Sequence, residues 1–153
     1  PTPALIVRQE GNNAHTHPFV SVYEAYKKSG PNVLGVEALQ GDDGCTGVKV
    51  NTADGYADYL FSATDMQAHH PSKRVSFCGG LGLIREKEGQ IQLMYLGCGR
   101  SLKKGNFVLE SDHDVYAAIY MQHGVWYYSA TGPVRVKIGK ETKELNEGYN
   151  QKL

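Results

Sequence analysis

Short apolar runs divided by turn-forming residues are the feature that most restricts the folds open to this chain. The runs are rich in Val, Ile, Tyr and Phe, while Gly, Asn, Asp or Pro occupies nearly every gap between them. No window holds a helical apolar period longer than two turns. The pattern predicts an all-β fold, an antiparallel two-layer β-sandwich of about eleven strands that forms a single domain over residues 1–153.

The predicted strands follow these runs along the chain. They are Ala4–Gln9, Phe19–Lys27, Val33–Leu39, Gly47–Asn51, Tyr56–Ser62, Arg74–Arg85, Gln90–Cys98, Phe107–Glu110, Val115–Gln122, Val125–Ala130 and Val134–Ile138. The two strands around "QHGVW" are apolar on both faces, and such strands are usually covered by a second layer. The polar stretch "TDMQAHHPSKR" is expected to be an exposed loop, with His69 and His70 in a solvated turn.

A hairpin around "EKEGQ" can be predicted with its register. Pairing Arg85 with Ile91 places Cys78 opposite Cys98 and gathers apolar side chains of both strands on one face. That face consists of Phe77, Leu81, Leu83, Ile91, Leu93 and Tyr95. The opposed cysteines come close to disulfide range, but we expect two buried thiols rather than a bridge, since three cysteines cannot all pair.

Charge and hydropathy argue against two classes of partner. The 16 basic and 16 acidic residues balance, so the chain lacks the excess of Lys and Arg that nonspecific nucleic-acid binding requires. No apolar run approaches the roughly 20 residues that span a bilayer. We therefore expect neither nucleic acid nor a membrane as a partner.

Two histidines one residue apart, His15 and His17, are the first candidates for chemistry. Alternate residues of a strand share a face, so the pair could hold a metal ion with a third ligand from Asp112–Asp114. The pair could also act as catalytic bases, or lie on a loop rim without chemistry. Pro18 places His17 at the entrance of a strand rather than inside it, so we expect rim histidines and neither metal nor cofactor.

Two further groups of side chains could contact a sugar. The segment "GCGRSLKKG" carries three positive charges in a predicted turn, where they could contact an acidic sugar or simply be solvated. The aromatic run from Trp126 to Tyr128 could offer a stacking platform, although a hairpin this apolar must give part of the run to the core. The candidate carbohydrate contacts are His15, His17, Arg100, Lys103, Trp126 and Tyr128.

Several sequence patterns follow one another in a recognisable order. "PALIVRQEG" is followed by "HPFVSVYEAY" and "NVLGVEAL", and then by "VSFCGGLGLIREKEGQIQLMYLGCGRSLKKGNFVLES". The last stretch contains an "F-x-G-x-x-x-x-I-R" strand, a "GQ" hairpin and a "G-x-x-L" turn. Together these short motifs resemble the C-terminal β-domain of heparinase II/III-like polysaccharide lyases over most of the chain.

The resemblance implies a supporting function. Lyases of this kind place an α-helical toroid ahead of β-sandwich layers and cleave acidic glycans by β-elimination, with the catalytic Tyr in the toroid. None of the toroid is present in this sequence. His15 and His17 echo the family's H-x-H, but the acidic residue that follows is missing and the order of motifs differs, so no metal or catalytic role is transferred to them.

The sequence thus predicts a non-catalytic C-terminal accessory domain of a secreted or periplasmic polysaccharide lyase. Its expected partners are the upstream catalytic domain of the same chain and an acidic polysaccharide, whose cleft it could help to line. One alternative is an independent carbohydrate-binding module that uses Trp126 and Tyr128. A second alternative is a small metal-dependent enzyme built on His15, His17 and Asp112–Asp114.

Overall fold

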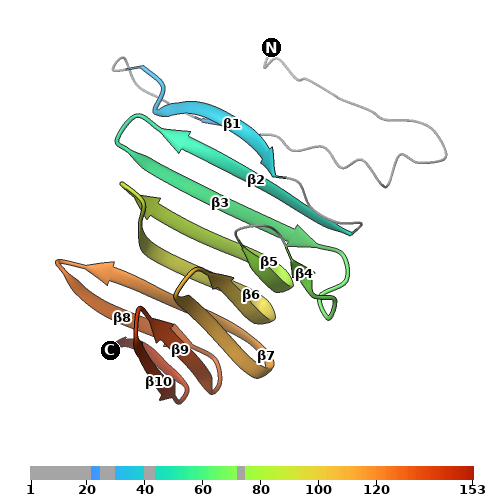
Figure 1. Ribbon diagram of the computed structural model, residues 1–153, viewed down its shortest axis with the longest axis vertical. Helices are drawn as coiled ribbons and strands as arrows, with labels where there is room; N and C mark the ends of the chain where they lie inside the picture. The colour runs from blue at the N-terminus through green and yellow to red at the C-terminus, as the bar shows by residue number, and fades with distance from the viewer. Residues whose placement is uncertain (1–21, 25–29, 40–43, 72–74) are drawn as a thin grey trace, which may run out of the picture.

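The computed structural model describes residues 22–24, 30–39, 44–71 and 75–153, and these form one antiparallel sheet of eleven strands (Figure 1). The strands are β1 (Val33–Leu39), β2 (Cys45–Thr52), β3 (Tyr56–Ala63), β4 (His70–Pro71), β5 (Ser76–Lys87), β6 (Gln90–Lys104), β7 (Phe107–Gln122), β8 (Val125–Ala130), β9 (Val134–Ile138), β10 (Glu141–Leu145) and β11 (Gly148–Lys152). The predicted all-β, antiparallel fold is confirmed. Within those ranges no segment forms a helix, and so none is a helix that could cross a membrane.

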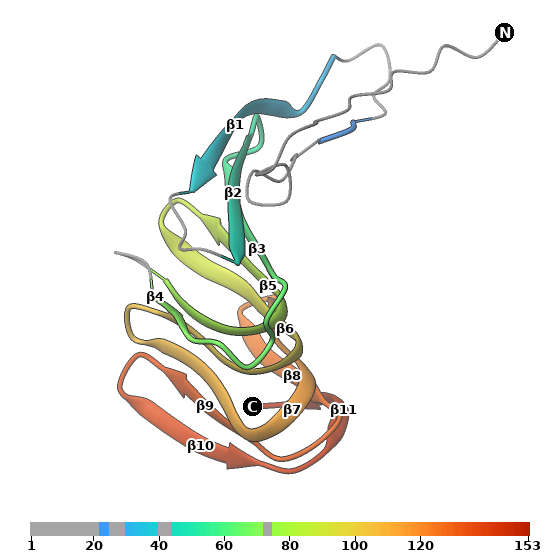
Figure 2. The ribbon, with the colours of Figure 1, turned by 90° about the vertical axis from the view of Figure 1, so that its right-hand side faces the viewer.

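The layers arise because a single sheet folds over on itself. Residues Phe107–Glu110 of β7 pair with β9, whereas residues Ala117–Gln122 of the same strand pair with β8. The two ends of one long strand therefore belong to different layers, and Figure 2 shows β5, β6 and β7 curving between them. We call β1, β2, β3, β8, β11 and the adjoining parts of β5, β6 and β7 the first layer. The second layer consists of β4, β9, β10 and the remaining parts of the three long strands.

Glycine makes the bend between the layers possible. The β5–β6 register shifts between Cys78 and Gly79, and the β6–β7 register shifts on both sides of Gly99. A Cβ atom on Gly99 would lie 2.6 Å from the Cys78 carbonyl oxygen and 2.6 Å from the Gly79 Cα. Since real Cβ atoms do not approach other atoms so closely, the two backbones meet only because both residues lack side chains.

One hydrophobic core fills the space between the layers. The first layer contributes Ile84, Met94, Leu96 and Ile119, which are completely buried. The second layer contributes Phe77, Leu102 and Leu109, which are at most 1% exposed. Burying side chains of this size contributes about 1.5–3 kcal/mol each, so the interlayer core is the main source of stability.

Strand positions were predicted better than strand ends. The predicted strands Val33–Leu39, Val125–Ala130 and Val134–Ile138 match β1, β8 and β9. The supposed turn "GCGRSLKKG" instead lies within β6, and the polar "SDHD" between two predicted strands lies within β7 at the bend. The sequence analysis missed β10 and β11, because their mostly exposed polar residues carry no apolar alternation. The predicted strand Ala4–Gln9 lies outside the described residues, and the described part of Phe19–Lys27, residues 22–24, is not a strand.

The predicted register of the "EKEGQ" hairpin is wrong by two residues. Lys87 pairs with Gln90 around a two-residue turn in which Glu88 and Gly89 both have positive φ. Arg85 therefore lies opposite Leu93, and Cys78 lies opposite Ser101 rather than Cys98; all three cysteines are free thiols.

Two register shifts in the β5–β6 pair, at Cys78/Gly79 and at Arg85/Glu86, divide the predicted apolar face between the two sides of the sheet. Phe77 and Ile91 are buried in the core. The outer face carries Leu81, Leu83, Leu93 and Tyr95 instead. His70, expected in a solvated turn, is only 7% exposed because it pairs with Phe77 in the short strand β4.

The glycine bend generates a stability prediction. Gly99→Ala should lower the free energy of unfolding by about 2–3 kcal/mol, because the new methyl group overlaps backbone that cannot move without opening the bend. Urea unfolding followed by the fluorescence of the single tryptophan measures the change. Gly35→Ala is the matched control, since a Cβ there meets nothing within 4 Å. Equal stabilities of the two variants would show that the close approach does not control the fold.

Candidate functional site

A cleft of about 570 Å³ opens on the outer face of the second layer. Its floor is one cross-strand row, in which each residue pairs with the next: Cys78, Ser101, Glu110, Arg135 and Glu144. Directly paired residues of an antiparallel sheet project to the same side, so five strands contribute neighbouring side chains to this floor.

Glu110 is the centre of an ion-pair network in the cleft. Its carboxylate accepts from Lys103 Nζ at 2.6 Å and from Arg135 Nη1 at 3.0 Å. Arg135 also donates from Nε to Glu144 Oε1 at 2.5 Å. The hydrogen bond from Lys103, followed by that from Arg135, holds the pKa of Glu110 below its usual value. The network therefore orders three long side chains along the floor.

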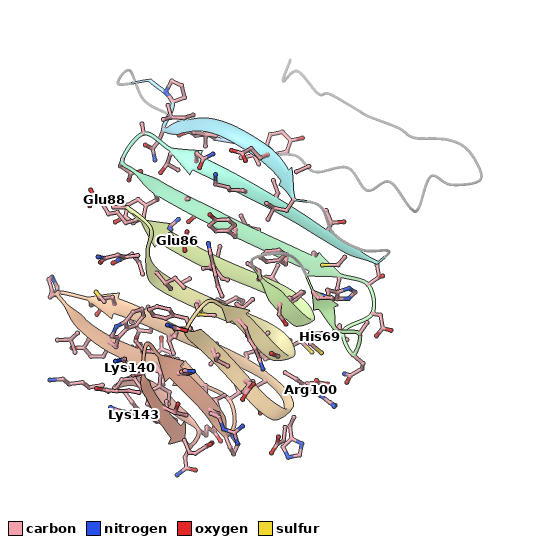
Figure 3. The ribbon with its side chains drawn as sticks, viewed as in Figure 1. His69, Glu86, Glu88, Arg100, Lys140 and Lys143 are labelled. Carbon is pink, nitrogen blue, oxygen red and sulfur yellow. The ribbon has the colours of Figure 1, made fainter. Side chains whose placement is uncertain are left out.

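Arg100 forms the other end of the cleft together with two histidines. Arg100 donates from Nε to Asp114 Oδ1 at 2.9 Å, and Gln67 donates to the second carboxylate oxygen at 2.9 Å. These bonds, that of Arg100 first, lower the pKa of Asp114. The terminal nitrogens of Arg100 have no hydrogen-bond partner within the described residues. His69 and His113 line the same cleft, and Figure 3 shows His69 and Arg100 at one corner of the molecule.

The hydroxyl of Ser101 lies at the cleft floor without a partner. Its Oγ atom is buried and makes no hydrogen bond to any described residue. A buried hydroxyl left unsatisfied costs about 1–3 kcal/mol, which a rotation toward an incoming polar group would recover. Ser101 is thus an unsatisfied polar group at the cleft floor, between Arg100 and Lys103 along β6.

The side chains of the cleft suit binding better than catalysis. Donors and acceptors alternate along the floor, which matches a ligand rich in hydroxyl groups, and the terminal nitrogens of Arg100 match a carboxylate or sulfate. Glu110, with its lowered pKa, is a weak general base at neutral pH. Burial raises the pKa of the Cys78 thiol, which makes this side chain a weak nucleophile.

The structure places two of the residues predicted to contact a carbohydrate together in the cleft and two others elsewhere. Arg100 and Lys103 both line the cleft, on strand β6 rather than on a turn. Tyr128 is 8% exposed and belongs to the core. Trp126 is half-buried and packs against Phe107 with ring centroids 5.9 Å apart, at the opposite, open end of the layers.

The predicted metal site combined two histidines near the start of the chain with residues Asp112–Asp114. His15 and His17 lie outside the described residues, so their expected rim position stays a prediction. Asp112 and His113 line the cleft. Within residues 22–24, 30–39, 44–71 and 75–153, no three His, Cys, Asp or Glu side chains are arranged to hold a metal ion.

Sequence reasoning missed the other members of the ion-pair network around Glu110. Arg135 and Glu144 come from β9 and β10, far along the chain from β6. The outward position of Arg135 could have been predicted from the sequence, because this residue alternates with the apolar Val134 and Val136, which are buried. The position of Glu144 could not have been predicted, since the sequence pattern did not indicate β10.

Comparison with known proteins places the chain among parts of larger enzymes. The family model described as "Endo-acting ulvan lyase C-terminal domain" matches residues 33–121, more than half of the chain. An endo-acting ulvan lyase of Formosa agariphila is 34% identical over 118 residues, which are 73% of this chain and 14% of that protein. The chain thus spans about one seventh of the length of this relative. No solved structure matches the chain significantly.

The ion-pair network generates a prediction about pH. Glu110→Gln should lower the free energy of unfolding at pH 7 by about 0.5–1 kcal/mol, as expected for partly exposed pairs. Because the folded pKa of Glu110 is below the usual 4.5, its contribution is present above that pH and is lost as the pH falls through the lower folded pKa.

Urea unfolding at pH 7 and at pH 3 should therefore show a difference between wild type and Glu110→Gln that shrinks at the acid pH. Glu141→Gln is the control, since Glu141 is exposed and has no ion pair within the described residues. A difference that stays constant from pH 7 to pH 3 would contradict the assignment.

Proposed function

The chain belongs to the family of endo-acting ulvan lyase C-terminal domains, and from this premise we propose that it is a non-catalytic accessory domain of a lyase that acts on acidic glycans. The domain would pack on the catalytic part of the same polypeptide and hold part of the polysaccharide. The observation that carries the glycan contact is the cleft that joins Arg100, Lys103 and Arg135 on one face. Ulvan, the glycan named for its relative, is the first ligand to test.

The architecture that we propose for the parent enzyme is heparinase II/III-like. In that arrangement a helical toroid supplies the catalytic Tyr, and the β-layers that follow support it and shape the cleft. The motif order from "PALIVRQEG" to "NFVLES" supports this proposal. A polysaccharide substrate is too large to be imported intact, which supports a secreted or periplasmic location.

The structure favours this function over an independent carbohydrate-binding module. A module that binds sugars by stacking displays aromatic rings on one accessible face, whereas Tyr128 lies in the core and Trp126 packs on Phe107. The metal-dependent enzyme depends on His15 and His17, which lie outside the described residues, so this alternative stays a prediction that the metal content of the purified chain tests.

Binding of ulvan oligosaccharide to the isolated chain tests the proposed cleft. Arg100→Gln and Lys103→Gln should each weaken binding about tenfold, because each removes a charge-assisted hydrogen bond to an acidic group, worth about 1.4 kcal/mol or more. Isothermal titration calorimetry in buffer of low and high salt measures the effect. Lys140→Gln removes an exposed cation from the β9–β10 turn and serves as the control (Figure 3).

Three outcomes would contradict the glycan contact. The first is no measurable binding by the wild-type chain, and the second is unchanged affinity in both cleft variants. The third is an equal loss in Lys140→Gln, which would indicate nonspecific attraction of charge rather than a site. In parallel, the isolated chain should form no unsaturated uronate from ulvan, measured by ultraviolet absorbance, and a clear signal would show that the domain is itself catalytic.

A further inference from the structure

The outer face of the first layer carries a continuous apolar surface, which we call the apolar stripe. Leu60 pairs with Leu83, and Leu83 pairs with Tyr95. Leu93, two residues before Tyr95, pairs with Tyr120, which pairs in turn with Tyr127. The stripe, Leu60, Leu83, Leu93, Tyr95, Tyr120 and Tyr127, therefore crosses β3, β5, β6, β7 and β8, with Arg85 opposite Leu93 at one end and Lys152 opposite Tyr127 at the other.

The stripe is unusual because the opposite side of the same strands is also apolar. Ile84, Met94 and Ile119 alternate with stripe residues and are completely buried between the layers. A sheet with one solvated face normally alternates apolar and polar residues, but here the outer positions are apolar and partly exposed. Strands that are apolar on both sides are typical of sheets covered on both sides, and contiguous exposed apolar area marks an interaction surface.

The border of the stripe beside Leu60, Leu83 and Leu93 carries a neutralised pair of charges. Arg85 donates two hydrogen bonds to Asp58, from Nε at 2.7 Å and from Nη2 at 2.6 Å. This bidentate pair neutralises the charges beside Leu83 and Leu60. The neighbouring Leu81 is 43% exposed and extends the apolar area at the other side. A partner with an apolar surface could cover Leu60, Leu83 and Leu93 without burying an unpaired charge, while the exposed Lys152 lies at the far end of the stripe, opposite Tyr127.

We propose that the apolar stripe is the surface on which the upstream catalytic part of the same polypeptide docks. This inference rests on the proposed function. The matched part of the Formosa agariphila lyase is 14% of that protein and corresponds to a C-terminal domain, so a large upstream portion of that protein is available as a partner.

Two features of the fold agree with this occupant. The described sheet begins with β1 at the edge of the first layer, the layer that bears the stripe, so a partner that precedes the sheet in the polypeptide is connected to this layer. The ion-pair cleft lies on the outer face of the second layer, which points away from the stripe. Docking on the stripe therefore leaves Arg100 and Lys103 accessible to a glycan.

Hydroxyl-radical footprinting of the full-length gene product and of the isolated chain tests the docking. Oxidation of Leu83, Tyr95 and Tyr120, read by mass spectrometry, should be at least threefold slower in the full-length protein. His113, which is exposed in the cleft of the second layer, should react equally in both. Equal reactivity of the stripe residues in the two proteins would overturn the proposal.

Light scattering of the isolated chain tests the other possible occupant of the stripe, a second copy of the same chain. A monomer with a reactive stripe agrees with the proposal. A dimer whose stripe is already protected would assign the surface to a second copy of the chain and would overturn it.

A charge placed in the stripe provides a second test in the full-length protein. Leu83→Glu should accelerate proteolytic release of the domain about tenfold, whereas Val108→Glu should not. Val108 is a matched control, since it is a partly exposed aliphatic residue on β7 of the second layer that pairs with Lys103 and Lys137. If Leu83→Glu lowers the melting temperature of the isolated chain, Tyr120→Ser replaces it. Unchanged release in a folded stripe variant would contradict the docking.

These results are distinguishable from a failure of the proposed function. If the cleft binds no glycan or the full-length protein has no lyase activity, the proposed function fails, whatever the footprint shows. If instead the isolated Leu83→Glu chain binds ulvan normally while the stripe is equally reactive in both proteins, only the docking inference fails.

Discussion

The close approach of Gly79 and Gly99 is the contact on which the rest of this structure depends. With a side chain at either position, β5 and β6 could not come together where both strands turn. The bend carries β6 and β7 from one layer into the other, so that the apolar sides of the two halves face each other. Without it the sheet would expose the side chains of Ile84, Met94 and Leu102 rather than bury them. The fold is thus a long sheet that supplies its own second layer.

The opposite, open end of the two layers is held by a different kind of contact. Lys104 from the second layer forms an ion pair of 2.8 Å with Glu86 of the first, and the two side chains are 13% and 12% exposed. The same ammonium lies 3.4 Å from the centre of the Tyr59 ring. Figure 3 shows Glu86 well away from His69 and Arg100. Partial burial protects this pair from solvent screening, so it fixes the spacing of the layers where Trp126 and Phe107 also meet.

The local sequence pattern predicted where several strands lie, but not how they pair. The runs at Val125–Ala130 and Val134–Ile138 have the composition and bounding turns of strands, and both strands occur there. The bend was not predictable in this way, because "GCGRS" has the composition of a turn, while its role depends on which strand lies opposite. A two-residue turn at Glu88–Gly89, with positive φ at both positions, and a register shift beside Arg85 together moved the hairpin pairing by two residues. The register shifts beside Arg85 and Gly79 also invert the alternation of side chains, so that Leu83 and Tyr95 lie on the outer face.

The same limitation applies to the candidate site. Arg100 and Lys103 could be singled out by their charge, but their neighbours Arg135 and Glu144 are brought beside them only by the pairing of β7, β9 and β10. Tyr128 and Trp126 were predicted to stack on a sugar because they are aromatic. The side of the strand on which each residue lies decides whether its ring is available to a ligand or fills the core. Residue type suggested the chemistry, and the strand pairing that assembles the site had to come from the structure.

The account assigns the two outer faces of one folded sheet to different partners, an apolar face to the enzyme and a charged face to its glycan. A structure of the full-length protein with a bound acidic oligosaccharide, determined by crystallography or electron cryomicroscopy, tests this most directly. The account predicts that upstream residues cover Leu83, Tyr95 and Tyr120, and that the oligosaccharide contacts Arg100 and Lys103. An apolar stripe open to solvent, or an oligosaccharide that approaches the domain only at other surfaces, would contradict it.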